Sequence, residues 1–375
     1  MSAVSIIDIL PADQASGRFI GRALSPQGPC VIMIRDCQIF DLTDEVATVS
    51  GAIARRAFAG GTALGPVEAG LPAGWTLLSP VDLQCIKAAG VTFALSAIER
   101  VIEERARGDA SRAAEIRGQL EDKIGSGIRS VIPGSAEAAD LKAALIDAGM
   151  WSQYLEVAIG PDAEIFSKSP VLSTVGAGEE IGVRSDSDWN NPEPEVVLAC
   201  DAHGEIVGAA LGNDVNLRDF EGRSALLLSK AKDNTASCSI GPFIRLFDDG
   251  FTLDDVRSAE VQLTIDGPEG YRLEGANRMA EISRDPQDLV SQCLSEHHYP
   301  DGFVLFCGTL FAPTQDRDTP GAGFTHKVGD RVTIRSARIG TLANTVTTSR
   351  DAPPWTMGIS GFVRNLAARG LIDRI

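Results

Sequence analysis

The strongest constraint on the fold is the alternation of short apolar runs with turn residues between residues 151 and 350. The runs include EVVLAC, AEVQLTID, FVLFC and RVTIR, and Gly, Pro, Asp and Asn separate them at short intervals. Such alternation is typical of strands joined by tight turns. The sequence therefore predicts a mainly β core over residues 151–350.

Helical patterns flank this core. Apolar residues recur at helical spacing between Ala94 and Arg107, and a Ser cap and a terminal Gly bracket a second pattern from Ser135 to Gly149. The run SGFVRNLAARG predicts a last helix, closed by Gly370. The middle of the chain and its end are therefore expected to be helical.

The first 80 residues differ in texture from the rest. They are rich in Gly, Ala and Pro, carry short β-like runs such as PCVIMIR, and show no clustered chemical groups. We expect residues 1–80 to form a small N-terminal domain and residues 81–375 the main domain.

Charge and hydropathy exclude several classes of protein. The chain has 34 Lys and Arg against 51 Asp and Glu, a formal charge of −17 that would repel an extended phosphate backbone. No apolar run approaches the ~18 to 20 residues that span a bilayer, and the start, MSAVSIIDILPADQ, lacks the features of a signal peptide. We expect a cytoplasmic protein that binds neither nucleic acid nor membrane.

Cysteine and histidine patterns give no support to a zinc site or a disulfide framework. The seven cysteines include no CxxC pair, and the four histidines show no HExxH spacing. Any bound metal is therefore expected to be held by carboxylates.

The segment SDSDWNNPEPEVVLAC carries the most informative pair of acids. Glu193 and Glu195 are two residues apart at the head of an apolar run, so on a strand they point to the same face. Two such anions repel each other unless a cation, a shared proton or solvent relieves them. Pro192 and Pro194 favour an edge strand or a strand entry, where a cleft could open.

A third acid follows about twenty residues later. Asp214 leaves a Gly-Asn turn in LGNDVNLRDFEGR, and three carboxylates suit Mg²⁺ or a similar hard cation. The alternative is a set of solvated loop acids, and for the pair Glu193 and Glu195 alone this alternative is favoured.

Lysine and threonine side chains lie in two later segments. Lys230 and Lys232 stand in SKAKDNTASCSIGPF, and a lysine near a metal cluster has a lowered pKa and could move a proton at neutral pH. Thr309 ends the run FVLFC, where its hydroxyl could bind a ligand carboxylate. Taken alone, each segment is better explained as a surface loop or turn.

Together these segments resemble the fumarylacetoacetate hydrolase family, from about Gly90 to Val346. The family pattern has an ExE strand, an NDxxxRD segment, a Lys nine residues before Gly-Pro, a GT turn and a terminal GD…GxLxN element. Here these stand in the same order as Glu193-Pro194-Glu195, Asn213-Asp214 with Arg218-Asp219, Lys232 before Gly241-Pro242, Gly308-Thr309, and Gly329-Asp330 with Gly340, Leu342 and Asn344.

The resemblance implies an α+β, mainly β fold of the β-roll type and a Mg²⁺ or Mn²⁺ ion held by Glu193, Glu195 and Asp214. It implies that Thr309 binds the substrate carboxylate, with Arg218 in a supporting role. It also prefers Lys232 over Lys230 as the proton-moving lysine, and Lys230 is kept as a candidate for substrate binding.

Residues 90–108 depart from the family pattern. Family members carry GxNYxxHxxE there, a mobile lid whose His and Glu activate water, and the matching positions are Thr92, Phe93, Ser96 and Glu99. Ser96 cannot accept a proton near pH 7 as imidazole does, so cleavage by an activated water is not expected. The resemblance implies a lid with Glu99 as its general acid or base.

Within the family, the chain is most similar to the 2-keto-3-deoxy-pentonate dehydratases. The expected activity is Mg²⁺-dependent dehydration of a 2-keto-3-deoxy-pentonate of the D-xylonate or D-arabinonate series to 2-oxoglutarate semialdehyde, in oxidative pentose degradation. The alternatives are a 2,4-diketo acid hydrolase that releases pyruvate and a non-catalytic protein stabilised by Ca²⁺ or Mg²⁺. Family habit suggests a homodimer or homotetramer.

Overall fold

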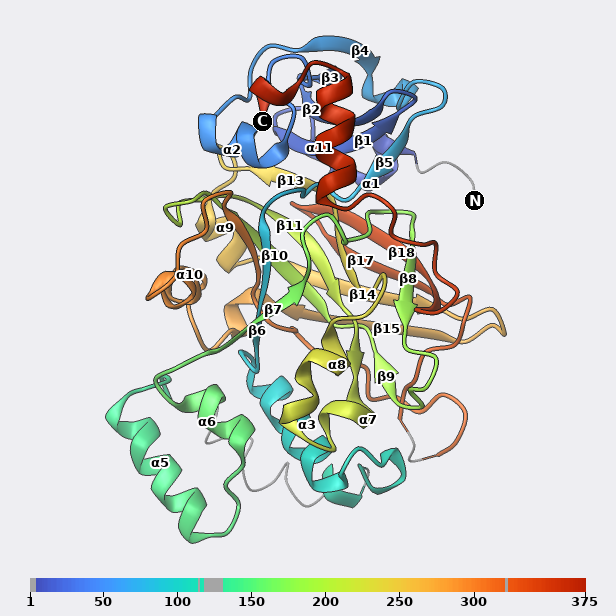
Figure 1. The fold of residues 1–375 in the computed structure, drawn as a ribbon. Coiled ribbons are helices and arrows are strands. Elements are labelled where there is room, and N and C mark those ends of the chain that lie inside the picture. Colours follow the sequence, from blue (N-terminus) through green and yellow to red (C-terminus); the bar gives the residue numbers. More distant parts are fainter. Residues whose placement is uncertain (1–4, 114, 118–130, 321–322) are drawn as a thin grey trace.

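The computed structural model describes residues 5–113, 115–117, 131–320 and 323–375, and one large sheet runs through most of it (Figure 1). Its strands, in spatial order, are β4 (Thr62–Pro66), β3 (Gln38–Asp41), β2 (Gly28–Arg35), β1 (Phe19–Ser25), β13 (Cys238–Leu246), β11 (Ile206–Asp214), β10 (Pro194–Cys200), β16 (Phe303–Phe306), β6 (Cys85–Gly90) and β7 (Glu164–Ser169), while β5 (Thr76–Leu78) pairs with β1.

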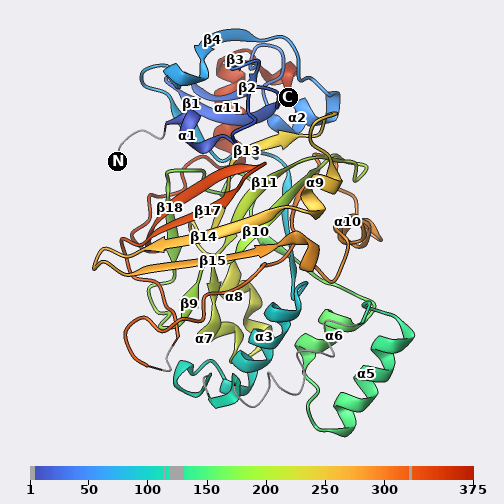
Figure 2. The ribbon, with the colours of Figure 1, turned by 180° about the vertical axis from the view of Figure 1, so that it is seen from behind.

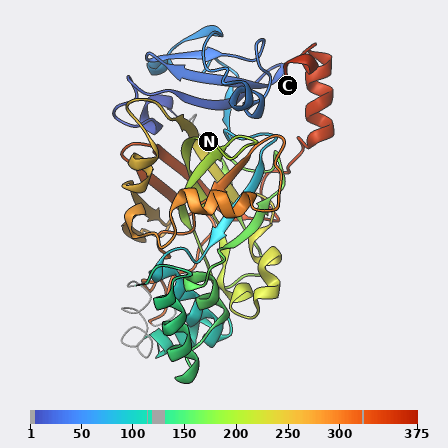
Figure 3. The ribbon, with the colours of Figure 1, turned by 90° about the vertical axis from the view of Figure 1, so that its left-hand side faces the viewer.

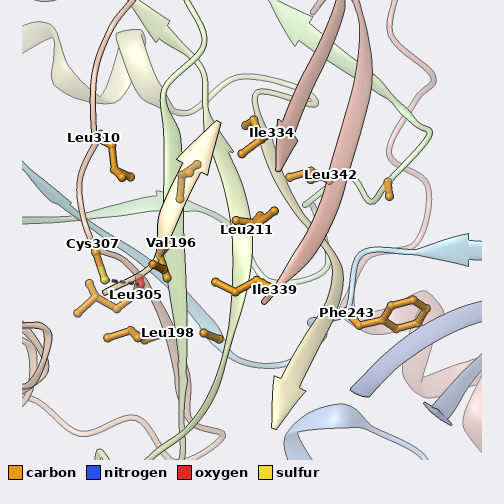
Figure 4. Close-up of a cluster of buried hydrophobic side chains, with 14 of the residues drawn as sticks. Val196, Leu198, Leu211, Phe243, Leu305, Cys307, Leu310, Ile334, Ile339 and Leu342 are labelled. Atoms are coloured by element: carbon orange, nitrogen blue, oxygen red, sulfur yellow. Dashed lines mark hydrogen bonds between the residues drawn. The ribbon is translucent and has the colours of Figure 1, made fainter. Parts of the chain in front are cut away.

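A second sheet of five strands packs against the middle of the first (Figure 2). Its order is β15 (Arg272–Arg278), β14 (Glu260–Asp266), β17 (Arg331–Ser336), β18 (Gly340–Thr348) and β8 (Glu180–Val183). Figure 4 shows side chains of β10 and β11 in one buried cluster with side chains of β17 and β18. This packing agrees with the expected mainly β fold and explains why both sheets are apolar on their facing sides.

The expected strands of the core are all present, but one expectation about their placement is wrong. Glu193 directly precedes β10 and Glu195 is its second residue, and β10 lies between β11 and β16 in the interior of the large sheet. The prolines therefore do not mark an edge strand. Pro194 is the first residue of β10, so the other expectation, a strand entry, holds.

The predicted helices are also present. They are α3 (Ala94–Ala106), α5 (Ala136–Asp147) and α11 (Ile359–Ala368), and α6 (Gln153–Ile159) packs beside α3. The Ser135 side chain accepts the Ala138 N–H, as a helix cap should. Helices α3, α5 and α6 gather at the end of the molecule opposite the N-terminal strands (Figure 3).

Shorter elements complete the described structure. They are α1 (Ile6–Ile9), α2 (Val49–Arg55), α7 (Arg218–Glu221), α8 (Leu228–Lys232), α9 (Leu253–Arg257), α10 (Pro286–Leu294), a two-stranded ladder of β9 (Asn190–Asn191) and β12 (Asn216–Leu217), and the 3-10 turns η1 (Val67–Ala69), η2 (Ala225–Leu227), η3 (Met279–Glu281) and η4 (Ile372–Arg374). Within the described ranges, no helix is both long and apolar enough to cross a membrane.

The N-terminal strands pair with a strand of the core and contact the C-terminal helix. Strand β1 joins β13 through the pairs Phe19 with Arg245 and Ile20 with Ile244, so the N-terminal strands continue the large sheet. Helix α11 covers these strands, and its Arg369 C-cap donates to the Pro29 carbonyl at 2.7 Å (Figure 1). The division into residues 1–80 and 81–375 stays a prediction.

A candidate metal centre and active site

Three carboxylates converge where β10 begins and β11 ends. In the antiparallel ladder Pro194 pairs with Asn213 and Glu195 with Gly212, which brings the ends of the two strands together. Glu193, Glu195 and Asp214 are all buried, and one oxygen of each lies within 4.8 Å of the others. The Glu193 carbonyl accepts the Asp214 N–H at 3.1 Å, which fixes the two side chains relative to each other.

Three basic side chains reach these carboxylates from different elements. Lys232, at the end of α8, contacts Glu193 and lies 3.1 Å from Asp214. Lys168, on β7, lies 2.8 Å from the other Asp214 oxygen. Arg100, on α3, lies 2.5 Å from Glu193. Long-range topology therefore assembles the site from both halves of the large sheet and from the helical end.

A small cavity adjoins the triad. Its wall includes Ser96, Arg100, Glu164, Phe166, Glu221 and Thr309 beside Lys232 and the three carboxylates. It has room for about one water molecule. A five-carbon acid is larger, so the wall must move before such a molecule can enter.

Burial and like charge shift the ionisation of several acids here. Burial first, and then the carboxylates Asp214 and Glu193, raise the pKa of Glu195 well above its usual range. Burial and the Glu221 carboxylate raise the pKa of Glu164 to about 7. In the absence of a cation, Glu164 therefore titrates near neutral pH, and Glu195 keeps its proton to a higher pH than an ordinary glutamate does.

The lysine behaves differently from the sequence-based expectation. Burial lowers the pKa of Lys232, but the Asp214 and Glu193 carboxylates raise it more, and the result lies above the ordinary lysine value. Burial would raise the pKa of Asp214, yet Lys168 and Lys232 outweigh it and lower that pKa. The expected lowered lysine pKa is therefore wrong for this arrangement, in which Lys232 is an ammonium.

The charge balance of the cluster fits a divalent cation. Five carboxylates and three basic groups border the cavity or contact the triad, so the formal charge is −2 when all are ionised; the groups are Glu164, Glu193, Glu195, Asp214 and Glu221, with Arg100, Lys168 and Lys232. Carboxylate oxygens are the ligands that Mg²⁺ and Mn²⁺ prefer. The residues present therefore suit such an ion in both donor type and charge.

The structure brings most of the predicted site residues together. The three carboxylates, Lys232, Ser96 and Thr309 all border the cavity. The Thr309 hydroxyl donates to the Phe311 carbonyl at 3.0 Å in this arrangement.

Glu99 is not brought to the cavity. It accepts two hydrogen bonds from Arg117, at 2.7 and 3.1 Å, and lies 3.7 Å from Arg218. Ser96 and Arg100 are the residues of α3 that border the cavity, and Glu99 points to a neighbouring side of the helix. Its role as general acid or base stays a prediction without a contact to support it.

Arg218 and Lys230 also lie away from the cavity wall. Arg218 is buried but donates to Asn191 at 2.7 Å and to the Pro313 carbonyl at 3.1 Å, instead of pairing with Asp219. Lys230 is exposed, and its ammonium lies 4.7 Å from the centre of the Phe220 ring. Neither side chain borders the cavity, and the substrate-binding roles of Arg218 and Lys230 stay predictions.

Four charged residues of the site were not predicted from the sequence. They are Arg100, Glu164, Lys168 and Glu221, of which Lys168 contacts Asp214 and the other three border the cavity. A signal existed for the first three, since Arg100 follows Ser96 by four residues on a helix and Glu164, Phe166 and Lys168 alternate along a strand. This spacing points to site residues only when α3 and β7 are known to face the triad.

Comparison with known proteins identifies the class. The model of the fumarylacetoacetate (FAA) hydrolase C-terminal family matches residues 156–347. The chain therefore belongs to the fumarylacetoacetate hydrolase family, and its α+β, mainly β fold agrees with the family resemblance found in the sequence.

Two relatives narrow the comparison. A Haloferax volcanii protein named "Probable 2-keto-3-deoxyxylonate dehydratase" is 35% identical over 202 residues, which cover 54% of this chain and 66% of that protein. The Saccharolobus solfataricus protein named 2-dehydro-3-deoxy-D-arabinonate dehydratase is 32% identical over 186 residues, covering 49% and 58%. Each alignment thus spans less than two thirds of the relative's length.

Solved structures show the same fold. A 2-keto-3-deoxy-D-arabinonate dehydratase complexed with magnesium and 2,5-dioxopentanoate superposes with a TM-score of 0.62 at 22% identity, covering 88% of this chain and 99% of that one. A fumarylacetoacetate hydrolase from Exiguobacterium antarcticum superposes with a TM-score of 0.55 at 16% identity, covering 88% and 99%.

Proposed function

We propose that this protein is a hydro-lyase that removes water from a 2-keto-3-deoxy-pentonate with the help of Mg²⁺ or Mn²⁺. The observation that carries the proposal is the convergence of Glu193, Glu195 and Asp214 on a closed cavity that also contains Lys232. The names of the two curated relatives support the substrate class. The product would be 2,5-dioxopentanoate, which is 2-oxoglutarate semialdehyde.

The chemistry asks for charge stabilisation at one end of the substrate and proton transfer further along. A divalent cation bound by the triad would take up the carboxylate and keto oxygens of a 2-keto acid and stabilise negative charge on the keto oxygen. The protein groups must then remove a proton from C3, let the C4 hydroxyl leave as water, and move a proton to complete the shift to an aldehyde at C5.

Two cavity residues suit the proton transfers. Glu164 has a pKa raised to about 7, so near neutral pH it can both take and return a proton. Lys232 is a buried ammonium beside the triad and can donate a proton to the departing hydroxyl. We assign Glu164 as the general base at C3 and Lys232 as the general acid.

Hydroxyl groups complete the wall. Thr309 and Ser96 border the cavity on different sides, on the turn after β16 and on α3. We propose that the Thr309 hydroxyl turns from the Phe311 carbonyl to the substrate carboxylate, and that α3 is the lid whose movement admits the substrate. A closed lid would exclude water from the reacting carbons.

The cavity wall favours dehydration over hydrolysis. Ser96 occupies the position expected for the water-activating histidine, and none of the described residues that border the cavity is a histidine. Elimination does not need an activated water, whereas cleavage of a carbon–carbon bond by water does. We propose dehydration on this ground, and an oxidative pentose pathway, the cytoplasm and a homodimeric or homotetrameric assembly stay proposals with it.

A substrate assay tests the proposal. The EDTA-treated protein is mixed with a 2-keto-3-deoxy-pentonate with and without Mg²⁺, and the products are followed by NMR. The expected result is Mg²⁺-dependent formation of 2,5-dioxopentanoate. Release of pyruvate from a 2,4-diketo acid at a higher rate would overturn the proposal in favour of a hydrolase, and no turnover of either acid would favour a non-catalytic protein.

A further inference from the structure

The two oxygens of Glu193 and of Asp214 have different partners. Glu193 accepts from Arg100 through Oε1 at 2.5 Å and from Lys232 through Oε2. Asp214 has Lys168 Nζ 2.8 Å from Oδ1 and Lys232 Nζ 3.1 Å from Oδ2. In each carboxylate one oxygen is thus fixed by a partner of its own, and the other shares the Lys232 ammonium.

Glu195, the third carboxylate, also has one oxygen that is held by a partner of its own. Glu195 Oε2 accepts the backbone N–H of Gly308 at 2.7 Å, while its other oxygen has no described hydrogen bond. Gly308 has a φ of +98°, and a side chain there would collide with Thr92, so this close approach of the backbone needs glycine.

We call the oxygens next to Arg100, Lys168 and the Gly308 N–H the outer oxygens, and the other oxygen of each carboxylate the inner one. The partners of the outer oxygens come from different parts of the fold. Arg100 lies on α3, Lys168 on β7 and Gly308 on the turn after β16, so the three outer oxygens are held from three directions. Among the residues that the structure describes, Lys232 alone reaches inner oxygens of two carboxylates, and its side chain is only 3% exposed. One small cation bonded to several converging carboxylate oxygens is also the arrangement of a bound divalent ion.

We propose that the Lys232 ammonium holds the place of the divalent cation while the site is metal-free, and that Arg100, Lys168 and the Gly308 N–H aim the inner oxygens at that place. Cation binding then displaces Lys232 from both carboxylates and frees its ammonium to face the substrate. This inference rests on the proposed function, because it takes the triad to be a cation site.

Replacing Lys232 and replacing Lys168 should change the cation affinity in opposite directions, although both lysines contact Asp214. Replacing Lys232 removes a competitor for the inner oxygens. Replacing Lys168 removes the same charge from Asp214 but also the partner that fixes its outer oxygen, and lost support of this kind typically weakens a metal site 10- to 100-fold. If only the buried charge mattered, both replacements would change cation affinity in the same direction.

Isothermal titration of the EDTA-treated protein with Mg²⁺ and with Mn²⁺ tests this contrast. Relative to wild type, Lys232→Met is expected to bind about tenfold more tightly, and Lys168→Met about tenfold more weakly. Equal or weaker binding by Lys232→Met, or an equal shift in the same direction for both variants, would overturn the inference. If wild type binds the cation and Lys232→Met binds it no more tightly, this inference is wrong but the proposed function is not affected. If neither wild type nor any variant binds the cation, the proposed function is wrong as well.

Thermal unfolding supplies a readout that does not depend on titration. Lys232→Met leaves Glu193 and Asp214 without their shared cation, so it should melt below wild type in EDTA and gain more than wild type from Mg²⁺. Lys232→Gln, which keeps a hydrogen-bond donor but not the charge, is the second variant and should behave in the same way. Equal Mg²⁺-dependent gains in the melting temperature of all three proteins would contradict the place-holding role.

Discussion

Arg100 Nη2 lies 2.5 Å from Glu193 Oε1, so the helix proposed as a lid touches a candidate metal ligand directly. The same guanidinium pairs with Glu103 at 2.7 Å and contacts Glu221, and all four side chains are at most 8% exposed. The Arg100 guanidinium thus links α3 to α7 and to the start of β10. The position of α3 and the electrostatics of the triad are therefore physically linked.

Replacing this guanidinium should loosen α3. Arg100→Leu leaves three buried carboxylates without their common partner, and removal of one partner from a buried ion pair costs about 3 to 5 kcal/mol. Urea unfolding should show a loss of this order, and hydrogen exchange should accelerate over Ala94–Ala106. Arg105→Leu is the control, because Arg105 lies on the same helix and has no ion pair among the described residues. Similar losses in both variants would mean that the helix, not the ion pair, sets the effect.

Replacing Glu195 should weaken metal binding without changing the stability of the metal-free protein. The raised pKa of Glu195 means that the metal-free protein keeps a proton on this residue to a higher pH than an ordinary glutamate does, and glutamine resembles that protonated form. Glu195→Gln should therefore unfold at an almost unchanged urea concentration in EDTA, yet bind Mg²⁺ at least tenfold more weakly. Cation binding to wild type must expel the proton, so affinity should rise with pH and protons should be released. Titration in buffers of different ionisation enthalpy measures this, and full binding by Glu195→Gln would remove Glu195 from the ligand set.

Glu164 makes the metal-free protein sensitive to pH. Its pKa rises from 4.5 in the unfolded chain to about 7 in the fold, so between these values the folded state binds more protons than the unfolded state. The free energy of unfolding should therefore fall as pH rises from about 4.5 to 7, by roughly 3 kcal/mol at most. Glu164→Gln should flatten that part of the profile, measured by urea unfolding in EDTA. A wild-type profile without this slope would contradict the raised pKa.

Local sequence patterns predicted the elements well because their causes are local. The spacing of apolar residues in Ala94–Ala106 and the Ser135 cap depend on neighbours a few residues away, and both helices formed as expected. The same holds for the pair Glu193 and Glu195, whose convergence follows from strand alternation. The placement of β10 in the centre of the sheet was not predictable in this way, because it depends on β16, more than a hundred residues later.

The rest of the site depends on contacts between distant segments. Lys168 lies 46 residues before Asp214 and Arg100 lies 93 residues before Glu193, so nothing in either local sequence indicates the pairing. The pKa of Lys232 is raised instead of lowered for the same reason, since the carboxylates of Glu193 and Asp214, from distant parts of the chain, decide it. Family resemblance predicted the candidate ligands, but the groups that contact them emerged only from the fold.

The choice of general base is the sharpest test of the site. Family resemblance points to Glu99, whereas the structure places Glu164 at the cavity and holds Glu99 against Arg117 at 2.7 Å. If Glu164 removes the C3 proton, Glu164→Gln should lower kcat about 10²- to 10⁴-fold while Mg²⁺ affinity stays within a few-fold of wild type. Glu99→Gln should then change kcat far less, because its partner Arg117 lies outside the cavity wall. Steady-state kinetics at saturating Mg²⁺ decides between them, with the pH profile of kcat as a second readout, since loss of a general base removes the rise of kcat around pH 7. A large loss in Glu99→Gln with near-normal turnover in Glu164→Gln would show that α3 swings Glu99 onto the substrate when the lid closes, and the assignment made from the structure would fall.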